Sequence, residues 1–572
     1  MATVLHAATN AGGIVQRKLQ RMRGEACQVG ARGYYCVITK AGAVTLPPLS
    51  QELKEKTDGY RLYADEVSIV IQSASPRGVM YGWQDFEKQG SVPVGFFKEN
   101  APDRAFRAAH IDLRYGFFNR QRLKEIIDNL VELRYNTLIL ENENRLPFQR
   151  RPELVAEEHF TEEDLQWLNE YAAEQFLELI PLQQTLGHLE YALRLPQYEQ
   201  LREVRQQPEP EDEPLFYPGI TGGAHFHDFD EICPCNEEGY RLVEDLLDET
   251  MAYFPNSRYI HIGSDEAWNL LYCDQCRAKY GEDGKAKLLI EHVNRIARRV
   301  LAAGKTPIIW DDMLRSMSPL ELDQLDKGIV VMSWLYHSQH PQADEFLPAF
   351  QQAGFSVLGA GSAKCSIGTI ETLDVPDYAG RLNNVDWWSK ACDAHHLLGF
   401  SMTVWSNYSG TVAPPHPQFE TAWLPLAYGA AKMWDSALTQ ETFLNSYMQQ
   451  FFGIDQPIRG LSVNQLLPAA KMASESAKRH GYEARMWYLS VIAAIYRMKS
   501  QFVIRELHRY NQGISEAEYQ LLDRRVDEVN RLREWLKPHL EEALLKSFSQ
   551  RETDLFMASR FEADEVLYRT YE

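Results

Sequence analysis

The chain has 572 residues, of which 45% are hydrophobic, so it is too long for one ordinary domain and can bury a large core. Its 59 basic and 80 acidic side chains give a net charge of −21, which argues against nucleic acid or an anionic membrane as a partner. No apolar run reaches the roughly 18 residues of a membrane span, and residues 1–13 lack the pattern of a signal peptide. With only eight cysteines, the default expectation is a cytoplasmic protein with reduced thiols.

Residues 1–100 are predicted to form a small α+β accessory domain. Two strand patterns, at 60–64 and 68–72, are separated by a short polar turn. A helical pattern follows and runs through Phe86. This part of the chain carries no chemistry of its own.

Residues 101–430 alternate between strand and helix patterns, and the predicted helix starts carry capping residues, Asn119 for one and Thr161 with Asp164 for another. Eight short apolar segments have the composition of buried strands: 108–114, 136–142, 177–183, 259–264, 307–312, 329–336, 356–361 and 399–407. Strand–helix alternation repeated eight times favours an α/β fold of the (β/α)8 type, a TIM barrel, as the catalytic domain. Periodicity alone leaves a doubly wound sheet open.

One interval, between the third and fourth strand patterns, is much longer than the others. It contains a proline-rich acidic stretch at 207–211 and a glycine-containing segment at 222–228. Long loops in compact domains are usually functional or disordered. We expect either a lid over the barrel mouth or a solvated insertion.

Residues 431–572 are predicted to form a C-terminal helical domain. Ser515 and Glu518 form a capping-box pattern, and the helix that follows is expected to end at Pro538. A second amphipathic helix is expected over 485–506. These helices are the expected contact of a homodimer.

The strand pattern at 259–264 ends in two adjacent carboxylates, Asp265 and Glu266. Gly263 and Ser264 are small residues that let the backbone turn out of a sheet. Neighbouring side chains of a strand point to opposite faces, so the two carboxylates can converge on one ligand only where the strand breaks up at its C-terminal end. That end is where α/β enzymes keep their chemistry.

The hexapeptide His261-Ile262-Gly263-Ser264-Asp265-Glu266 resembles the catalytic signature of family 20 glycoside hydrolases, the β-N-acetylhexosaminidases. The resemblance implies that Glu266 is the general acid/base and that Asp265 orients the substrate's 2-acetamido N–H and stabilises its charge, with the acetamido oxygen as the nucleophile. The acid must be protonated at the working pH, so Glu266 needs an apolar or anionic surround, and Asp265 helps to supply one. The alternative interpretation is a solvated acidic turn or a salt-bridged pair.

Two further residues match the family's substrate-binding positions. Arg107 lies five residues before Asp112 of the first strand pattern, where the family has an arginine that holds ring hydroxyls, and a fork of donors suits vicinal hydroxyls. His188 follows the third strand pattern and aligns with the family's Gly-His near the bound sugar. The alternatives are a surface arginine and a structural histidine.

Trp310, Trp334 and Trp405 end the fifth, sixth and eighth strand patterns. Tryptophans at several strand ends can line an apolar slot for the acetamido methyl group and stack on sugar faces, as the family uses them. The alternative is packing inside the barrel, which the size of tryptophan disfavours. Two residues after Trp405 the family usually has a glutamate that contacts the outer hydroxyls; here Asn407 takes that place, which leaves the choice between gluco- and galacto-configured sugars open.

A second departure from the family concerns the tyrosine that donates to the acetamido oxygen. The family places a Tyr-x-Asp after the seventh strand, but residues 357–365 contain no tyrosine. Tyr336 or Tyr378 could substitute, and the sequence does not choose between them.

Four cysteines flank the fourth strand pattern and could supply thiolates to a zinc ion: Cys233, Cys235, Cys273 and Cys276. The glycosidase chemistry does not need this ion.

A second candidate metal site combines His225, His227 and Asp228, but these residues follow a Gly-Gly loop rather than an apolar strand. No metal is therefore assigned to the active site, and no cofactor is expected.

Together these patterns predict a three-domain, exo-acting, retaining β-N-acetylhexosaminidase that releases terminal β-linked GlcNAc, with GalNAc as a second candidate, through an oxazolinium intermediate. Its expected partner is an oligosaccharide or glycoconjugate with a terminal N-acetylhexosamine, and neither nucleic acid nor a membrane. Two alternatives remain open. One is a carbohydrate-binding barrel that has lost catalysis, and the other is a metal-dependent barrel hydrolase that uses His225, His227 and cysteines.

Overall fold

The computed structural model describes most of the chain, namely residues 6–9, 34–39, 46–66, 68–89, 92–114, 116–205, 230–338, 340–365, 374–406, 419–510, 513 and 515–569. Within these residues, no helix combines the length and the apolar character that crossing a membrane requires.

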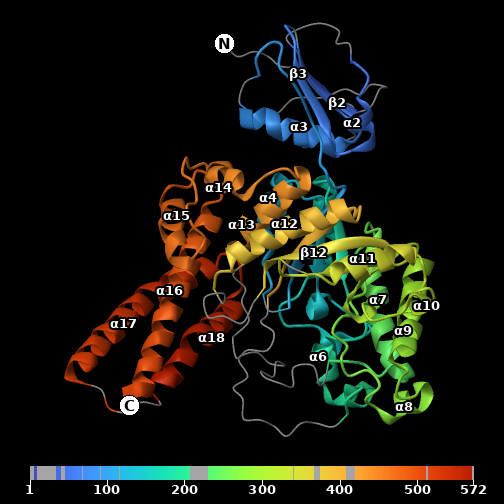
Figure 1. The fold of residues 1–572 in the computed structure, drawn as a ribbon, viewed down its shortest axis with the longest axis vertical. Coiled ribbons are helices and arrows are strands. Elements are labelled where there is room, and N and C mark those ends of the chain that lie inside the picture. Colours follow the sequence, from blue (N-terminus) through green and yellow to red (C-terminus); the bar gives the residue numbers. More distant parts are fainter. Residues whose placement is uncertain are drawn as a thin grey trace.

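Eight parallel strands close into a barrel at the centre of the molecule (Figure 1). Each pairs with the next along the chain, and the last pairs with the first, so the doubly wound sheet is excluded. All eight predicted strands are confirmed: β6 Phe106–Asp112, β7 Thr137–Glu141, β8 Glu178–Leu182, β9 Tyr259–His261, β10 Thr306–Trp310, β11 Val330–Trp334, β12 Ser356–Lys364 and β13 Gly399–Val404.

A helix follows each strand and covers the outside of the barrel. In strand order these helices are α4 Arg120–Glu132, α5 Glu162–Glu174, α7 Glu237–Tyr253, α9 Lys285–Ala302, α10 Pro319–Leu322, α11 Ala343–Gln352, α12 Tyr378–Ala394 and α13 Trp423–Trp434. The shorter α6 Glu190–Leu193 and α8 Asp274–Tyr280 lie in the loops after β8 and β9. The predicted caps form, because Asn119 accepts a hydrogen bond from the backbone N–H of Arg122, and Thr161 and Asp164 cap each other's backbone.

The barrel interior holds its own small apolar cluster, separate from the core between strands and helices. The cluster consists of side chains that point inward from alternate strand positions: Ala108, Ile139, Ile180, Leu182, Ile308, Trp310, Met332, Leu358 and Ala360. These residues fill the barrel, so chemistry is confined to its ends.

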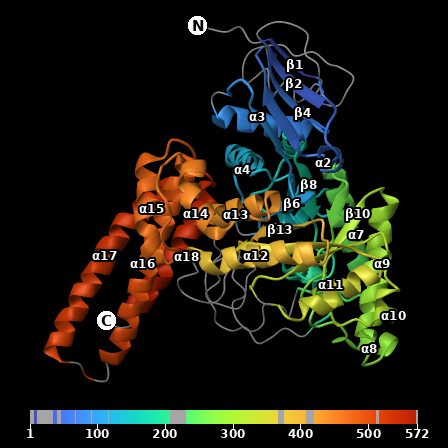
Figure 2. The ribbon, with the colours of Figure 1, turned by 45° about the horizontal axis from the view of Figure 1, so that its top comes forward.

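The N-terminal part forms an antiparallel sheet in the order β1-β2-β4-β3-β5, with α3 Pro76–Gln89 packed against it. Its strands are β1 His6–Thr9, β2 Tyr34–Thr39, β3 Tyr60–Ala64, β4 Ser68–Ser73 and β5 Phe97–Asn100, and α2 Gln51–Glu55 precedes β3. The sheet is attached to the N-terminal end of the barrel, where Arg77 donates to the carbonyl of Phe176 just before β8 (Figures 1 and 2).

The C-terminal part is helical and packs beside the barrel (Figure 2). It comprises α14 Gln440–Tyr447, a short π-helical turn Met448–Phe452, α15 Val463–Ser476, α16 Gly481–Tyr510, α17 Glu516–Leu544 and α18 Gln550–Arg569. The capping box of Ser515 and Glu518 is confirmed.

The prediction that Pro538 ends its helix is wrong, because α17 continues to Leu544. A proline inside a helix costs about 3 kcal/mol, but the turn that follows buries Leu540, Ala543 and Leu544. Burial of large apolar side chains contributes about 1.5–3 kcal/mol each, which offsets the lost hydrogen bond.

Candidate active site

The segment after β9 leaves the barrel through a run of left-handed backbone. Gly263, Ser264 and Glu266 have φ values of +63°, +67° and +52°. Gly263 is required, since a Cβ there would lie 1.8 Å from Oε1 of Gln184. The strand therefore breaks up where the sequence predicts, and the non-glycine residues store about 1–2 kcal/mol each of backbone strain.

His188 lies between the two carboxylates of this segment. Its Nε2 is 3.4 Å from Oδ2 of Asp265 and 3.4 Å from Oε2 of Glu266, and its Nδ1 is 3.8 Å from Oδ2 of Asp230. Close approach of the two loops depends on Gly187, where a Cβ would lie 2.9 Å from the carbonyl oxygen of Asp265. The structure thus brings His188, Asp265 and Glu266 together at the C-terminal end of the barrel, as the sequence leads us to expect.

The electrostatics of this trio favour an ion pair. Burial lowers the pKa of His188, but the charges of Asp265 and Asp230 and its hydrogen bonds to Asp265 and Glu266 raise it well above the ordinary value. Burial raises the pKa of Asp265. The charge and hydrogen bond of His188, together with a hydrogen bond from Gln184, nevertheless hold that pKa below its ordinary value of 3.8. At neutral pH, Asp265 is an anion and His188 a cation.

The two carboxylates differ in their access to solvent. The side chain of Asp265 is 9% exposed, whereas that of Glu266 is 30% exposed. Glu266 therefore faces the opening, and Asp265 lies deeper. A proton donor for a leaving group needs the first position, and a group that orients the substrate needs the second.

Asp312, which sequence reasoning missed, supports the catalytic segment from β10. Its Oδ2 accepts a hydrogen bond from the backbone N–H of Glu266 at 2.9 Å, and its Oδ1 accepts one from Nε1 of Trp334 at 3.1 Å. Burial, followed by the charge of Asp265, raises the pKa of Asp312 to about 7. The sequence position of Asp312 could have indicated a role at the barrel mouth, because Asp312 follows the end of β10 as Asp265 follows β9.

A series of contacts runs around the barrel mouth from one strand end to the next. Nε2 of Gln184, after β8, lies 3.1 Å from Oδ1 of Asp265 and 3.4 Å from Oε1 of Glu141, at the end of β7. Oε2 of Glu141 is 3.1 Å from Nε2 of His110 in β6. The ring of His110 is 4.6 Å, centroid to centroid, from that of Trp405, after β13.

Aromatic side chains complete the series on the opposite side. Nε1 of Trp405 donates to the hydroxyl of Tyr336 at 3.0 Å. The Tyr336 ring lies 5.2 Å from that of Trp334, which donates to Asp312. The contacts therefore form a closed ring around the mouth, with Trp334 and Trp405 on its aromatic side.

Trp310 has a different place from the other two tryptophans. It is fully buried in the interior cluster, and its ring lies 4.4 Å from that of His261 and 6.3 Å from that of Trp405. Trp310 therefore packs inside the barrel beneath the mouth, as the alternative interpretation of the tryptophans proposes, and does not line the mouth.

Of the two tyrosines considered, only Tyr336 lies at the mouth. Tyr378 is buried at the start of α12, and its hydroxyl donates to the carbonyl of Thr421, 2.8 Å away. After the seventh strand, where the family tyrosine is absent, Lys364 donates instead to the backbone carbonyl of Trp405.

The predicted substrate contact of Arg107 is wrong. Arg107 is fully buried at the N-terminal end of β6, where it donates to the Asp58 carboxylate at 2.7 Å and to the backbone carbonyls of Arg104 and Arg134. It lies an odd number of residues from Asp112, so its side chain points to the opposite face of the strand. The arginine at the mouth is Arg114, whose Nε lies 3.1 Å from Oδ1 of Asp112.

Several residues that sequence reasoning singled out lie outside the described part of the chain. They are Asn407, which departs from the family pattern, and the candidate metal ligands His225, His227 and Asp228.

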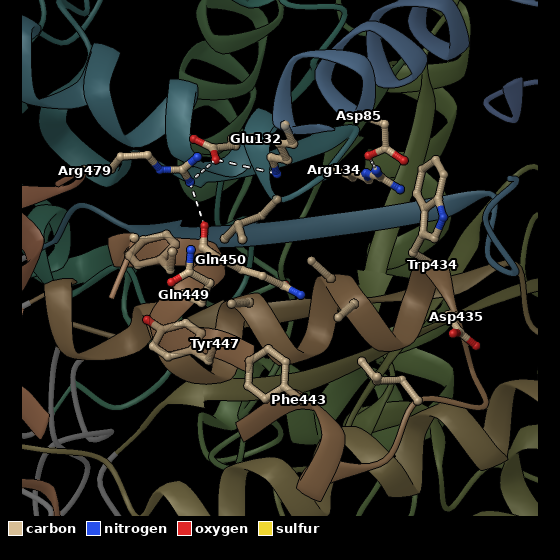
Figure 3. A pocket seen from close by; sticks show the side chains of 18 of the residues that line it. Asp85, Glu132, Arg134, Trp434, Asp435, Phe443, Tyr447, Gln449, Gln450 and Arg479 are labelled. Carbon is tan, nitrogen blue, oxygen red and sulfur yellow. Dashed lines mark hydrogen bonds and ion pairs between the residues drawn. The ribbon is translucent and has the colours of Figure 1, made fainter. Parts of the chain in front are cut away.

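A cavity of about 670 Å3 lies at the other end of the barrel, between α3, α4 and the helices from α13 onward (Figure 3). Its charged side chains pair with one another: Arg134 with Asp85, and Glu132 with both Lys88 and Arg479. Catalytic side chains of TIM barrels lie at the C-terminal end, so this cavity is not the active site.

Comparison with known proteins identifies the family. Residues 105–434, more than half of the chain, match the catalytic domain of glycosyl hydrolase family 20. Hexosaminidase D of Bos taurus is 27% identical over 315 residues, which cover 53% of this chain and 84% of that protein. The β-hexosaminidase of Vibrio furnissii is 26% identical over 322 residues, which cover 50% of this chain and 47% of that protein.

Solved structures agree in fold. The family 20 β-N-acetylhexosaminidase of Streptomyces coelicolor A3(2) has a TM-score of 0.57 at 20% identity, covering 80% of this chain and 93% of that one. A mutant β-hexosaminidase of Streptomyces plicatus, solved with its product GlcNAc, has a TM-score of 0.56 at 20% identity, covering 78% of this chain and 90% of that one. The match to the catalytic-domain family, together with the intact acidic pair at the barrel mouth, leads to one conclusion: the chain belongs to glycosyl hydrolase family 20 and is a glycosidase of the β-hexosaminidase type.

Proposed function

We propose that the chain is an exo-acting, retaining β-N-acetylhexosaminidase that releases terminal β-linked GlcNAc, with GalNAc as a second candidate. The observation that carries this proposal is the arrangement of Asp265 and Glu266 about His188 beside an aromatic wall. A relative of the same fold, the Streptomyces plicatus enzyme, binds GlcNAc as its product. The closed ring of side chains around the mouth suits the end of a glycan rather than its middle.

In the first step, the substrate's acetamido oxygen attacks the anomeric carbon while Glu266 gives its proton to the departing glycosidic oxygen. This forms a cyclic oxazolinium ion and releases the aglycone. Asp265, held as an anion by His188, accepts a hydrogen bond from the acetamido N–H and stabilises the positive charge of the ring.

In the second step, a water molecule gives a proton to the Glu266 carboxylate and attacks the anomeric carbon from the face that the aglycone left. The carbon–oxygen bond of the oxazolinium ring breaks, and the acetamido group is restored. Two inversions at the same carbon give net retention.

The acetamido group is proposed to lie against the aromatic side of the mouth. Trp334 and Trp405 offer apolar faces to its methyl group. The Tyr336 hydroxyl accepts a hydrogen bond from Trp405, which leaves it able to act as a donor to the acetamido oxygen.

Replacing Glu266 with glutamine tests the assignment of the acid. Loss of a general acid costs about 10²–10⁴-fold, and we expect this loss in kcat on poor leaving groups, such as a second sugar, and a much smaller loss on a dinitrophenyl glycoside. Wild-type turnover should require the 2-acetamido group, and proton NMR should show the β-anomer as the first product. The matched control, Glu237→Gln on the outer helix α7, should keep full activity.

Three results would contradict the proposal. They are equal turnover of aryl β-glucosides and aryl β-GlcNAc, release of the α-anomer first, or a Glu266→Gln loss that does not depend on the leaving group. Catalytic inactivity of the wild type on every aryl N-acetylhexosaminide would instead favour the carbohydrate-binding alternative.

The homodimer contact is proposed to involve α17, because this helix leaves Tyr519, Leu521 and Trp535 exposed. Sedimentation of the full chain should give twice the monomer mass, and Trp535→Lys should give the monomer. Sedimentation of the wild type as a monomer at micromolar concentration would refute this contact.

A further inference from the structure

Three thiols and a carboxylate meet in the loops beside the catalytic segment. Sγ of Cys233 lies 3.4 Å from Sγ of Cys273 and 3.6 Å from Sγ of Cys276, and Sγ of Cys276 lies 3.3 Å from Oε2 of Glu203. All four residues are buried, and one donor atom from each lies within 4.8 Å of the others.

These separations match the edges of a zinc tetrahedron. With Zn–S bonds of about 2.3 Å and Zn–O bonds of about 2.0 Å, tetrahedral angles place two sulfurs about 3.8 Å apart and a sulfur and an oxygen about 3.5 Å apart. A disulfide would bring two sulfurs to about 2.05 Å. It would also join only one pair, whereas Cys233 is close to two partners.

The charge balance also calls for a cation. Glu203 is fully buried, and within the described part of the chain no lysine, arginine or histidine lies within ion-pair distance of its carboxylate. A buried carboxylate among thiols is costly unless it is paired or binds a metal. An ion can reach these side chains from solvent, because Glu203 and Cys273 line a surface cavity of about 400 Å3.

We propose that Cys233, Cys273, Cys276 and Glu203 bind one zinc ion in a closed, structural tetrahedral site. The surrounding backbone supports the ligands, since the N–H of Cys276 donates to Sγ of Cys273 and the N–H of Cys273 donates to Oε1 of Glu203. Four protein ligands leave no open position for water or substrate, so the ion takes no part in bond breaking.

The ion joins the two loops that build the catalytic centre. Glu203 and Cys233 belong to the connection from β8 to α7, which also carries His188 and Asp230. Cys273 and Cys276 belong to the connection from β9 to α9, which carries Asp265 and Glu266.

Hydrogen bonds of Gln184 with Asp265 and of Thr185 with Ser264 join these loops next to the strand ends, and further hydrogen bonds join them farther out. One of them is the hydrogen bond from the N–H of Asn269 to Oε1 of Glu231, at 2.8 Å. The zinc adds a link with four ligands to these hydrogen bonds and so helps to fix His188 against the two carboxylates, and this role rests on the function proposed above.

Cys235 is the rival for the fourth position. It lies two residues after Cys233, is partly exposed, and its thiol is within hydrogen-bond reach of Cys276. Glu203 is preferred because its oxygen, and not the Cys235 sulfur, falls within the group of four mutually close donors.

The test is the metal content of the purified full-length chain, measured by mass spectrometry without reference to activity. We expect one zinc per chain in the wild type, in Cys235→Ser and in the matched control Cys392→Ser, whose buried thiol lies in α12. Cys273→Ser and Cys276→Ser should lose the metal, and Glu203→Gln should weaken its binding at least about tenfold.

Wild-type protein reloaded with Co2+ provides a measurement that does not depend on whether a variant folds. Its spectrum should show thiolate-to-cobalt charge transfer and the intense d–d bands of a tetrahedral site. After chelation, the wild type should lose activity to heat at least tenfold faster.

Three outcomes would overturn the proposal. Less than a tenth of a zinc per chain after expression in zinc-supplemented medium, or a Cys233–Cys273 disulfide, removes the site altogether. Loss of zinc in Cys235→Ser but not in Glu203→Gln removes Glu203 from it. A zinc-bound chain without glycosidase activity would support the metal site and refute only the proposed function.

Discussion

Replacing His188 with glutamine removes a cation that contacts both catalytic carboxylates. Asp265 must be ionised to accept the acetamido N–H, and Glu266 must be protonated to act as an acid. The imidazolium favours the ionised form of Asp265, so its removal makes Asp265 hold its proton to higher pH. The acidic limb of the pH profile of kcat/KM should therefore move toward alkaline pH.

The size of the shift follows from the distance of 3.4 Å between Nε2 of His188 and each carboxylate oxygen. Two unit charges at this separation interact by about 1.2 kcal/mol in water and about 4.9 kcal/mol at an effective dielectric constant of 20. At 1.36 kcal/mol per pH unit, this range corresponds to about 1 to 3.5 units. The side chain of Asp265 is buried, so its shift belongs near the upper end of this range.

The acidic limb should consequently move by about 2–3 pH units. The assay is kcat/KM on an aryl β-GlcNAc across the stable pH range of each variant. Asp230→Asn is the matched control, because His188 stays in place beside Asp265 and Glu266. A uniform fall in kcat/KM with the acidic limb unmoved would show that His188 does not act through its charge.

Three further predictions concern Arg107, Tyr336 and Asp312. Arg107→Ala should leave KM unchanged but cost about 3 kcal/mol of unfolding free energy, the lower end of the range for a broken buried pair, because the buried Asp58 keeps Arg77 as a second partner; denaturant unfolding measures this, and a large rise in KM would restore the substrate-binding role. Burial raises the pKa of Asp58, but the charges of Arg107 and Arg77 lower it overall, so this stability is present above pH 3.8 and is lost on further acidification, with a larger loss in the wild type than in the variant. Tyr336→Phe should lower kcat/KM about 10²-fold if its hydroxyl stabilises the acetamido oxygen during attack; a change in KM alone would contradict that role. Asp312→Asn should remove pH dependence near 7 from kcat/KM while keeping the fold, and an unchanged profile would show that Asp312 does not titrate in the working range.

The sequence predicted the barrel because its strands and helices are encoded locally. Each of the eight buried strands is a short apolar segment, and caps such as Asn119 act within one turn of helix. The candidate catalytic pair was predicted in the same way, since Asp265 and Glu266 directly follow a strand and a glycine turn.

What the sequence did not predict depends on which way a side chain points and on what packs around it. Arg107 matches a family position, yet strand alternation turns it outward and a buried aspartate from another domain holds it. Tyr336 could not be separated from Tyr378 because the two differ in tertiary neighbours rather than in local pattern. Pro538 has the local signal of a helix end, and buried residues beyond it override that signal.

The N-terminal sheet and helix α18 contact opposite ends of the barrel. The N-terminal sheet meets the starts of the strands through Asp58 and Arg107, whereas Glu552 of α18 pairs with Arg145, just beyond the end of β7. An enzyme immobilised on a solid support through its N-terminal sheet would present its mouth to the solution. Immobilisation through α18 would instead place the support beside the catalytic rim and hinder bulky glycans, so the attachment point sets which substrates such a material can process.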